Sequence, residues 1–599
     1  MIYHCEDHTC NYWDEGEKLP ERCPQCGRKL LRANEADMTG DDWTALGNTL
    51  WDAEASDKKR MVDCFRKAAY LGSAWGVCNL GICMEQGNGV EADPVQAFWL
   101  YQQAVEMGSL NAVCCLGVCY QYGIGTAPDA EKAAELYCKA AEYGSPRGQM
   151  LLARAFHDGI GVEADAAEAV HWVRAAAYQR YGEGMYRLGV CYEYGDGVEQ
   201  NWEHAVHWFR EAAESGVSVA MTDLGYCYEK GCGVEQSWEQ AFSWYRRGAE
   251  CGDLRSMHNL GYCYEKGRGV EQSWEQAFSW YRRGAECGYP VSMSNLGLCY
   301  KRGYGVDQNW QEAIKWYEQG AQCGDLQCMH NLACCYERGE GVEQNEERAL
   351  YWYRRGAEAG SDYCMYCLGW NYSNGEGVEQ NMTEAIRWYT AAAEGGNADA
   401  MHNLGWLYDH GEGVEQDMKK AICWYERAAE QNHPAAMNSL GECYAMGRGV
   451  PRDLETAMEW YRRAAELGEA MADYNMGWHL EQAGKLSEAY AHYRKAADGN
   501  DDSAWWALGR FYENGVVVAQ DGKEARRCYE TGEKLGSVKC KMRLARCKLL
   551  GIGGRREKKA GLDLCRQALE LAKESSEKED YGYEAEMNLL RRTIAENES

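Results

Sequence analysis

The stretch LGYCYEKGCGVEQSWEQAFSWYRRGAECG, residues 224–252, returns as residues 260–288 with one change, Cys232 to Arg268. A Gly-x-Gly pair lies at its centre, followed by valine or, in one repeat, by threonine, and this pair recurs every 36 residues. The pairs begin at Gly87, Gly123, Gly159, Gly195, Gly231, Gly267, Gly303, Gly339, Gly375, Gly411 and Gly447. A constant period of this length is typical of a solenoid, in which each repeat packs against its neighbours.

Each repeat is predicted to form two helices joined by the glycine turn. The apolar positions of the first helix are Met221, Leu224, Gly225 and Tyr228, and those of the second are Ala241, Trp244, Tyr245 and Ala249. Their spacing of three and four residues places each set on one helix face. Gly231 suits the left-handed conformation that ends a helix. Ser237 is a good N-cap, and Gln240 three residues later would complete a capping box.

These residues resemble the Sel-one-like repeat family, a helix-turn-helix solenoid related to tetratricopeptide repeats. The shared pattern is Leu-Gly-x-x-Tyr before the Gly-x-Gly turn and Trp-Tyr-x-x-Ala-Ala or its variants after it. The resemblance implies an all-α, right-handed α-α superhelical solenoid. We expect about fifteen helix-turn-helix repeats, preceded by a small zinc ribbon.

The repeats suggest a division of the chain into six parts. These are a metal module at 1–35, a shortened first repeat at 41–73, eleven regular repeats at 74–468, a tetratricopeptide-like repeat at 469–500, two degenerate repeats at 501–574 and a closing helix at 575–599. A solenoid needs such a closing helix because its last repeat would otherwise expose an apolar face.

The N-terminal segment carries a metal-binding pattern. Cys23 and Cys26 are two residues apart, and Gly27 follows them, as in the knuckles of zinc ribbons and rubredoxins. Cys5 and Cys10 are the expected second pair, with His8 as the alternative to Cys10. Four protein ligands leave no open position for a substrate, so the site is expected to be structural. Zinc is preferred to iron because no redox partner is evident.

The cysteines outside the N-terminal segment follow the repeat and are typical of packing rather than of catalysis. A slot before tyrosine in the first helix holds Cys83, Cys119, Cys191, Cys227, Cys263, Cys299, Cys335 and Cys443. Alanine or leucine takes this slot in other repeats, so buried free thiols are expected there. The lone Ser-x-x-Lys at Ser56 lacks the other motifs of penicillin-binding enzymes and is expected to cap a helix. No catalytic constellation is predicted.

A binding surface is expected along the outward positions of the first helices, which we call the groove positions. In the tetratricopeptide relatives these helices line the concave face. The candidate residues are Asn259, Asn295, Asn331, Asn403, His258, His330, His402, Tyr226, Tyr262, Trp370 and Trp406. Asparagine amides carry both a donor and an acceptor and suit an extended peptide backbone. The alternative is that the asparagines bond neighbouring helices and that the histidines are solvated or packed.

The net charge, the apolar runs and the cysteine content limit what kind of protein this chain is expected to be. The formal net charge is −30, which disfavours nucleic acid and anionic membranes. No apolar run approaches membrane-spanning length, and no secretory signal is visible, so thirty cysteines point to a reducing, cytoplasmic setting. The leading hypothesis is a monomeric, non-enzymatic scaffold that binds protein or peptide partners in its groove. The alternatives are a cell-wall or peptide hydrolase and a nucleic-acid-linked regulator acting through the zinc ribbon.

Overall fold

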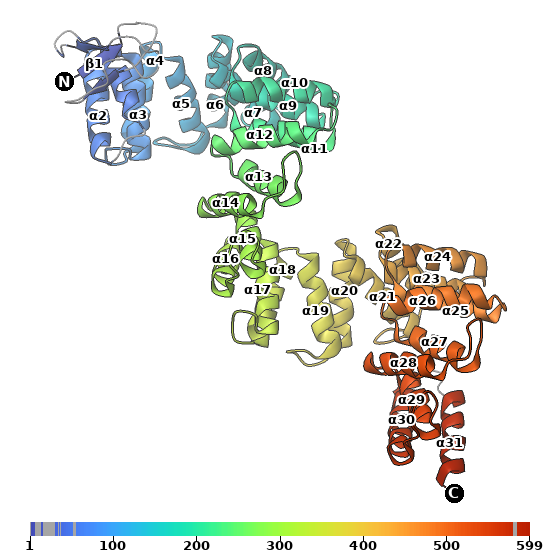
Figure 1. The fold of residues 1–599 in the computed structure, drawn as a ribbon. Coiled ribbons are helices and arrows are strands. Elements are labelled where there is room, and N and C mark those ends of the chain that lie inside the picture. The colour runs from blue at the N-terminus through green and yellow to red at the C-terminus, as the bar shows by residue number, and fades with distance from the viewer. Residues whose placement is uncertain are drawn as a thin grey trace. The chain divides into compact units, whose positions relative to one another are not determined.

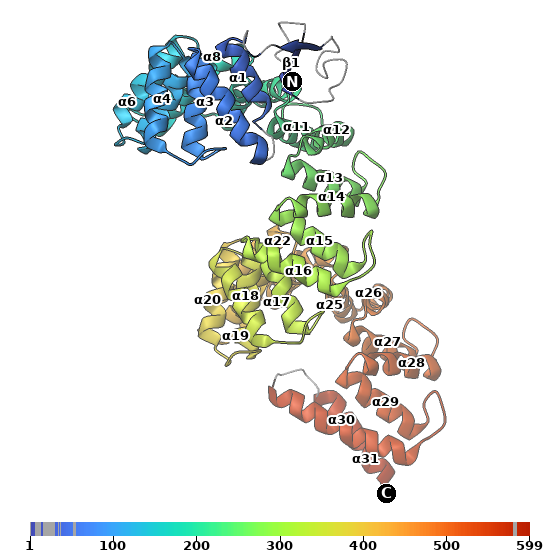
Figure 2. The same ribbon diagram turned by 90° about the vertical axis from the view of Figure 1, so that its left-hand side faces the viewer.

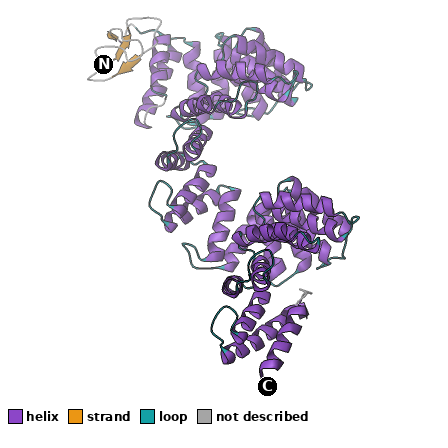
Figure 3. Ribbon diagram, turned by 45° about the vertical axis from the view of Figure 1, so that its right-hand side comes forward, coloured by secondary structure: helices purple, strands orange, loops and turns teal. Residues whose placement is uncertain are grey.

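The computed structural model describes residues 2–5, 13–15, 30–33, 35, 38–51, 55–578 and 584–598. Within them, helices joined by short turns follow one another along the chain, and three short strands precede the helices (Figures 1 and 3). The chain divides into two compact units, Met1–Asn309 and Trp310–Ser599.

The first unit contains β1 (Ile2–Cys5), β2 (Trp13–Glu15), β3 (Leu30–Ala33), α1 (Gly40–Thr49), α2 (Ala55–Tyr70), α3 (Ala74–Gln86), α4 (Pro94–Glu106), α5 (Leu110–Tyr122), α6 (Ala130–Glu142), α7 (Pro146–Asp158), α8 (Ala166–Tyr178), α9 (Gly182–Tyr194), α10 (Trp202–Glu214), α11 (Ser218–Lys230), α12 (Trp238–Glu250), α13 (Leu254–Lys266), α14 (Trp274–Glu286) and α15 (Pro290–Arg302).

The second unit contains α16 (Trp310–Gln322), α17 (Leu326–Arg338), α18 (Glu346–Glu358), α19 (Asp362–Asn374), α20 (Met382–Glu394), α21 (Ala398–His410), α22 (Met418–Glu430), α23 (Pro434–Met446), α24 (Leu454–Glu466), α25 (Ala470–Gln482), α26 (Leu486–Asp498), α27 (Asp502–Asn514), α28 (Gly522–Lys534), α29 (Val538–Leu550), α30 (Lys558–Lys578) and α31 (Glu584–Glu598).

The described helices confirm the predicted all-α repeat architecture. In the first unit they pair in succession from α1 with α2 to α13 with α14, in the second unit from α17 with α18 to α29 with α30, and α31 follows as a single helix. Figure 2 shows α31 lying beside α30 at the C-terminal end. Met587 and Leu590 of α31 are buried in a cluster with Met542 and Cys565, so α31 covers the last apolar face, as a closing helix should.

The three strands form an antiparallel sheet in the order β2-β1-β3. Four of the five metal-ligand candidates, His8, Cys10, Cys23 and Cys26, lie outside the described residues. The fifth, Cys5, ends β1, but its side chain is not described. The metal site therefore stays a prediction.

The glycine of the Leu-Gly pair in the first helix makes room for a tyrosine ring of the second helix. In the quoted repeat, Tyr245 from the second helix is fully buried and lies against Gly225. A Cβ atom on Gly225 would lie 2.5 Å from Tyr245 Cε1, closer than any van der Waals contact. The same ring-on-glycine contact recurs at Gly261 with Tyr281. The glycine thus lets the two helices of a repeat close on a buried aromatic ring.

The Gly-x-Gly turn also has a contact that joins neighbouring repeats. Gly231 ends α11 with φ 76° and ψ 29°, the left-handed cap that was predicted. Gly233, with φ 68°, lies against the backbone of Trp202, the first residue of the preceding second helix. Gln236 in the same turn donates from Nε2 to the Glu229 carbonyl at 2.8 Å. The turn is therefore held by its own repeat and by the one before it.

The two near-identical copies adopt matching conformations. The N-caps Ser237 and Ser273 have φ and ψ of −149° and 112°, and −148° and 112°. Ser237 accepts the Gln240 N–H at 3.3 Å, but its own backbone N–H donates to the Tyr228 carbonyl at 2.9 Å, so only half of the expected capping box forms. The one substituted position differs in its contacts, because Arg268 lies 4.4 Å from the centre of the Trp238 ring.

Candidate binding site

The tyrosine of the second helix also anchors a carboxylate on the groove side of its repeat. Tyr281 donates to Glu265 Oε2 at 2.8 Å, and Glu265 also pairs with Lys266 at 2.7 Å. Tyr245 and Glu229 repeat this bond at 2.9 Å. Other pairs with the same 16-residue spacing are Tyr101 with Glu85, Tyr353 with Glu337, and Tyr529 with Glu513. Sequence reasoning missed this bond, although the recurring spacing of glutamate and tyrosine was a signal for it.

The three candidate histidines are packed between aromatic rings. The His258 ring centre lies 5.5 Å from that of Tyr281 and 6.0 Å from that of Tyr289. His330 lies between Tyr353 and Tyr363 in the same way. Burial lowers the pKa of His258 to about 4, so its imidazole is neutral at physiological pH. Of the two alternatives for these residues, packing is the one found in the structure.

His402 is packed against Tyr425 and His433, with ring centres 5.8 Å and 5.2 Å away. Burial, followed by the charge of His433, lowers its pKa to about 4. The imidazole also lies 3.4 Å from the Ser439 hydroxyl of the next repeat. His402 therefore connects two neighbouring repeats. It also lines a cavity among α19, α20 and α21.

The candidate asparagines are half-buried, and several make contacts within the solenoid. Asn295 lies close to the Tyr281 hydroxyl, and Asn403 lies close to the hydroxyls of Tyr366 and Tyr389. Asn331 accepts from Gln327 on its own helix at 3.1 Å. Asn259 is also half-buried on α13. These contacts support a scaffold role beside any role in binding.

The aromatic groove candidates are more open to solvent. Tyr226, Trp370 and Trp406 are exposed, by 43%, 44% and 36% respectively. Tyr262 is half-buried, with Lys266 and Arg268 near its ring. Exposed tryptophans can contribute much of the energy of a protein interface, because their large rings lose little conformational freedom on binding.

Four of the predicted residues meet in one cavity of the second unit. It has a volume of about 410 Å³ and lies among α19, α20 and α21. Its walls include the predicted residues Trp370, His402, Asn403 and Trp406, together with Tyr389 and Glu412. The cavity combines aromatic surface with a few polar groups, which is the usual character of a ligand pocket. We call it the tryptophan pocket.

A second cavity, of about 400 Å³, lies among α7, α8 and α9 of the first unit and was not predicted. Its lining contains charges of both signs, including Arg154, Arg187 and Asp196. His157 bridges two carboxylates there, with Nδ1 2.6 Å from Asp158 and Nε2 3.2 Å from Asp196. The Asp158 contact raises the pKa of His157. Sequence spacing alone does not show that this histidine meets two carboxylates.

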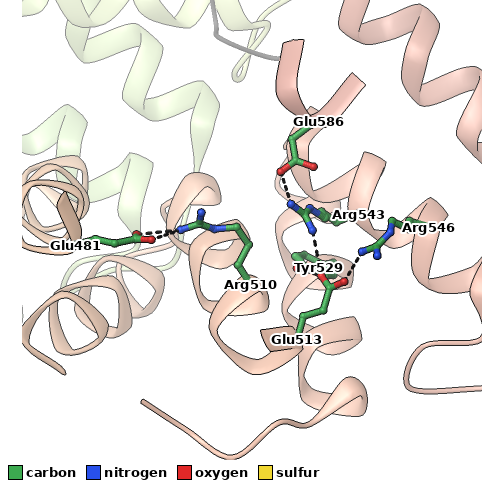
Figure 4. Close-up of polar contacts among 7 residues, drawn as sticks. All are labelled: Glu481, Arg510, Glu513, Tyr529, Arg543, Arg546 and Glu586. Atoms are coloured by element: carbon green, nitrogen blue, oxygen red, sulfur yellow. Dashed lines mark hydrogen bonds and ion pairs between the residues drawn. The ribbon is translucent and has the colours of Figure 1, made fainter. Parts of the chain in front are cut away.

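The last repeats carry a charged cluster at groove positions (Figure 4). Arg543 on α29 lies between Glu513 on α27, at 3.3 Å, and Glu586 on α31, at 2.6 Å. Arg546 also pairs with Glu513. In the same view Arg510 points to a separate partner, Glu481 on α25. These ion pairs are largely buried. The pair between Arg543 and Glu586 joins the closing helix α31 to α29.

The cysteines of the slot before tyrosine are packed, as predicted. Cys83, Cys119, Cys227, Cys263, Cys299, Cys335 and Cys443 are buried, and Cys191 is half-buried. Burial raises the pKa of Cys227 to about 12, so this thiol is protonated and unreactive at neutral pH. The cysteines from Cys64 to Cys565 are all free thiols.

The described residues contain neither a metal cluster nor a membrane-spanning helix. They include no group of three or more histidine, cysteine, aspartate or glutamate side chains arranged to hold a metal. No helix among them combines the length and the apolar character needed to cross a membrane. The fold, the groove positions and the tryptophan pocket define the class as an α-α repeat protein.

The family follows from comparison with known repeats. The model of the Sel1 repeat matches residues 76–109, 112–145, 146–181, 182–217, 218–253, 254–289, 290–325, 326–361, 362–397, 398–433, 434–469, 470–501, 504–537 and 538–573. The chain therefore belongs to the Sel1 repeat family, whose members are generally scaffolds for protein interaction.

Two solved structures are similar to this chain. One is c5321, a protective antigen present in uropathogenic Escherichia coli strains that displays an SLR fold; it is 32% identical, covers 75% of this chain and 97% of its own, and has a TM-score of 0.52. A Sel1 repeat protein from Oxalobacter formigenes is 31% identical over 41% of this chain and 96% of its own, with a TM-score of 0.38. No curated protein matches the chain.

Proposed function

We propose that the chain is a monomeric, non-enzymatic scaffold whose groove binds extended segments of partner proteins, with the tryptophan pocket as a principal contact. The observation that carries the proposal is the convergence of Trp370 and Trp406, both exposed, on one cavity of about 410 Å³. Large exposed rings on both walls of a cavity are a feature of a binding site rather than of a core.

The polar groups of the pocket suit a peptide. Asn403 lies at the cavity wall, close to the hydroxyls of Tyr366 and Tyr389. Glu412 lies at the cavity wall in the glycine turn that follows α21. An amide and a carboxylate can bond the carbonyl and N–H groups of an extended backbone while the tryptophans contact its side chains. No comparable grouping of a nucleophile, a base and an oxyanion donor was found among these residues.

The test is selection of binders from a library of unstructured peptides displayed on phage, using the full chain. Selected peptides are measured against wild type and the double variant Trp370→Ala/Trp406→Ala. The matched control is Trp99→Ala, because Trp99 is 64% exposed on α4, a second helix away from the groove positions. We expect the double variant to lose binding and the control to keep it. Peptides that bind all three proteins equally would refute the pocket.

We also propose that residues 1–35 hold a structural zinc ion through Cys5, Cys10, Cys23 and Cys26. The support is the Cys-x-x-Cys-Gly knuckle in the sequence. The purified protein should contain one zinc, which Cys10→Ser should remove or weaken. If His8→Ala loses the metal and Cys10→Ser retains it, His8 is the ligand instead.

A reducing, cytoplasmic location is proposed because the described cysteines are free thiols. Fractionation of cells that produce the tagged chain is the measurement, and recovery outside the cytoplasm would contradict it. Sedimentation of the purified protein tests the monomeric state in the same preparation.

A further inference from the structure

A thiol and an imidazole meet on the groove side of α17 in the second unit. Cys334 follows His330 by four residues, so the two side chains lie on one helix face. Cys334 Sγ lies 3.5 Å from His330 Nε2 and 3.3 Å from the Tyr353 hydroxyl. Cys334 is only half-buried, whereas its neighbour Cys335 is fully buried in the packing slot.

Three repeats have a histidine at this groove position, and one of them has a cysteine four residues later. Tyr262 follows His258 by four residues, and Trp406 follows His402 by four. Only His330 has a thiol at that place. The chain thus provides matched sites in which the same packed imidazole has no sulfur partner on its own helix.

The surroundings hold the imidazole in a position to accept a proton. His330 lies between the Tyr353 and Tyr363 rings, with centres 6.1 Å and 5.9 Å away. Its Nδ1 is buried with no hydrogen-bond partner among the described residues. A neutral imidazole has one donor and one acceptor nitrogen, and Nε2, 3.5 Å from Cys334 Sγ, is the nitrogen placed to exchange a proton with the thiol.

A second thiol on the neighbouring repeat lies in a different environment. Cys367 also lies close to the Tyr353 hydroxyl, and burial raises the pKa of its thiol. The Tyr353 hydroxyl in turn donates to Glu337 Oε2 at 3.2 Å. Cys367 is therefore held in its protonated, unreactive form, and the reactivity of this cluster is concentrated on Cys334.

We propose that Cys334 is a reactive thiol, activated by His330, and a site of reversible modification by small-molecule disulfides. The Cys334 thiol transfers its proton to His330 Nε2, and the sulfur attacks one sulfur of the disulfide. The new S–S bond joins Cys334 to that half, while the original S–S bond breaks. The departing thiolate takes the proton from His330, so the net change is exchange of one thiol for another.

The test uses the full chain and compares its cysteines within one sample. The protein is treated briefly with limiting iodoacetamide, and separately with oxidised glutathione, and each cysteine is quantified by peptide mass spectrometry. The reference thiols are the exposed Cys251, Cys287, Cys323 and Cys423. We expect Cys334 to react roughly tenfold faster than these thiols although it is less exposed, because a histidine partner raises the thiolate fraction.

Variants separate activation from exposure. His330→Gln should slow Cys334 to the rate of the reference thiols or below, while their own rates stay unchanged. His258→Gln, in the equivalent position without a thiol four residues later, should leave Cys334 as fast as in wild type. Circular dichroism establishes that both variants are folded. The proposal is overturned if Cys334 reacts no faster than the exposed thiols, or if its rate is the same in folded His330→Gln.

Discussion

Two parts of the second unit have the same scaffold but different groove residues. In α21 the Leu404-Gly405 step lies against Tyr425, and in α27 the Leu508-Gly509 step lies against Tyr529. Around these steps, α21 presents His402, Asn403 and Trp406, which are uncharged at neutral pH. The corresponding positions of α27 and α29 include Trp506, Arg510, Arg543 and Arg546.

The difference separates the positions that build the scaffold from those that vary between repeats. The leucine, glycine and tyrosine make the same contacts in both places, because they close each helix pair. The remaining positions form an open aromatic pocket in one place and a buried network of ion pairs in the other (Figure 4). The first suits a partner molecule, and the second fastens the chain's own closing helix.

The largest expected effect comes from breaking the charged cluster. Glu513→Gln would leave Arg543 and Arg546 without their shared carboxylate in a largely buried setting. Removing one partner of a buried ion pair costs about 3 kcal/mol. Hydrogen exchange of the α29 and α31 amides should report this loss of local stability. Glu459→Gln, whose pair with Arg462 is exposed, is the control and should change stability by less than about 0.5 kcal/mol.

A smaller loss, about 2 kcal/mol, is expected from overpacking the shared scaffold with Gly405→Val. The branched side chain would press on the buried Tyr425 ring. Gly509→Val should cost a similar amount, because the contact is the same in the charged region. In α17 the position equivalent to Gly405 is Ala333, which is buried, as is Tyr353. Gly405→Ala should therefore lower the free energy of unfolding clearly less than Gly405→Val. Local hydrogen exchange measures each variant, and unequal losses at the two sites would break the comparison.

Exchanging groove residues between the two regions should alter binding without altering folding. Trp406→Arg places in the pocket the residue type found at Arg510. Peptides selected by the wild type should bind about thirtyfold more weakly, since loss of a tryptophan at the centre of an interface costs about 2 kcal/mol. Isothermal titration calorimetry gives the affinity, and an unchanged melting temperature is expected because Trp406 is 36% exposed. If the Trp406→Arg variant binds the selected peptides as tightly as the wild type, Trp406 is not part of the binding site.

Acid should affect the two regions in opposite directions. Burial lowers the pKa of His402 to about 4 and raises the pKa of Asp501, the N-cap of α27, to about 6. The His402 contribution is present above its unfolded pKa of about 6.5 and is lost as pH falls. The Asp501 contribution is present below its unfolded pKa and is lost as pH rises through about 6.

Between pH 7 and 5.5 we therefore expect α21 to lose, and α27 to gain, about 1 kcal/mol of local stability. Hydrogen exchange corrected for its intrinsic pH dependence makes the measurement. His402→Gln should abolish the change in α21 alone, and Asp501→Asn the change in α27 alone. A pH response of the same sign in both helices would contradict the assignment.

Local features were predictable because their causes lie within a few residues. Gly231 ends its helix and Ser237 caps the next one, since both conformations depend on short-range geometry. The buried leucines followed from helical spacing. The histidine environment did not follow, because the rings that cover His258 belong to the next helices along the chain.

The sequence by itself determined the period, the paired helices, the turn glycines and the need for a closing helix, because a repeating apolar pattern has one efficient way to bury itself. Only the tertiary structure decided which groove residues remain open. Trp370 and Trp406 flank a cavity, while His258 is covered and Arg543 is paired with Glu586. The physical reason is that exposure and pairing depend on side chains from neighbouring repeats, and the spacing within one repeat contains no information about them.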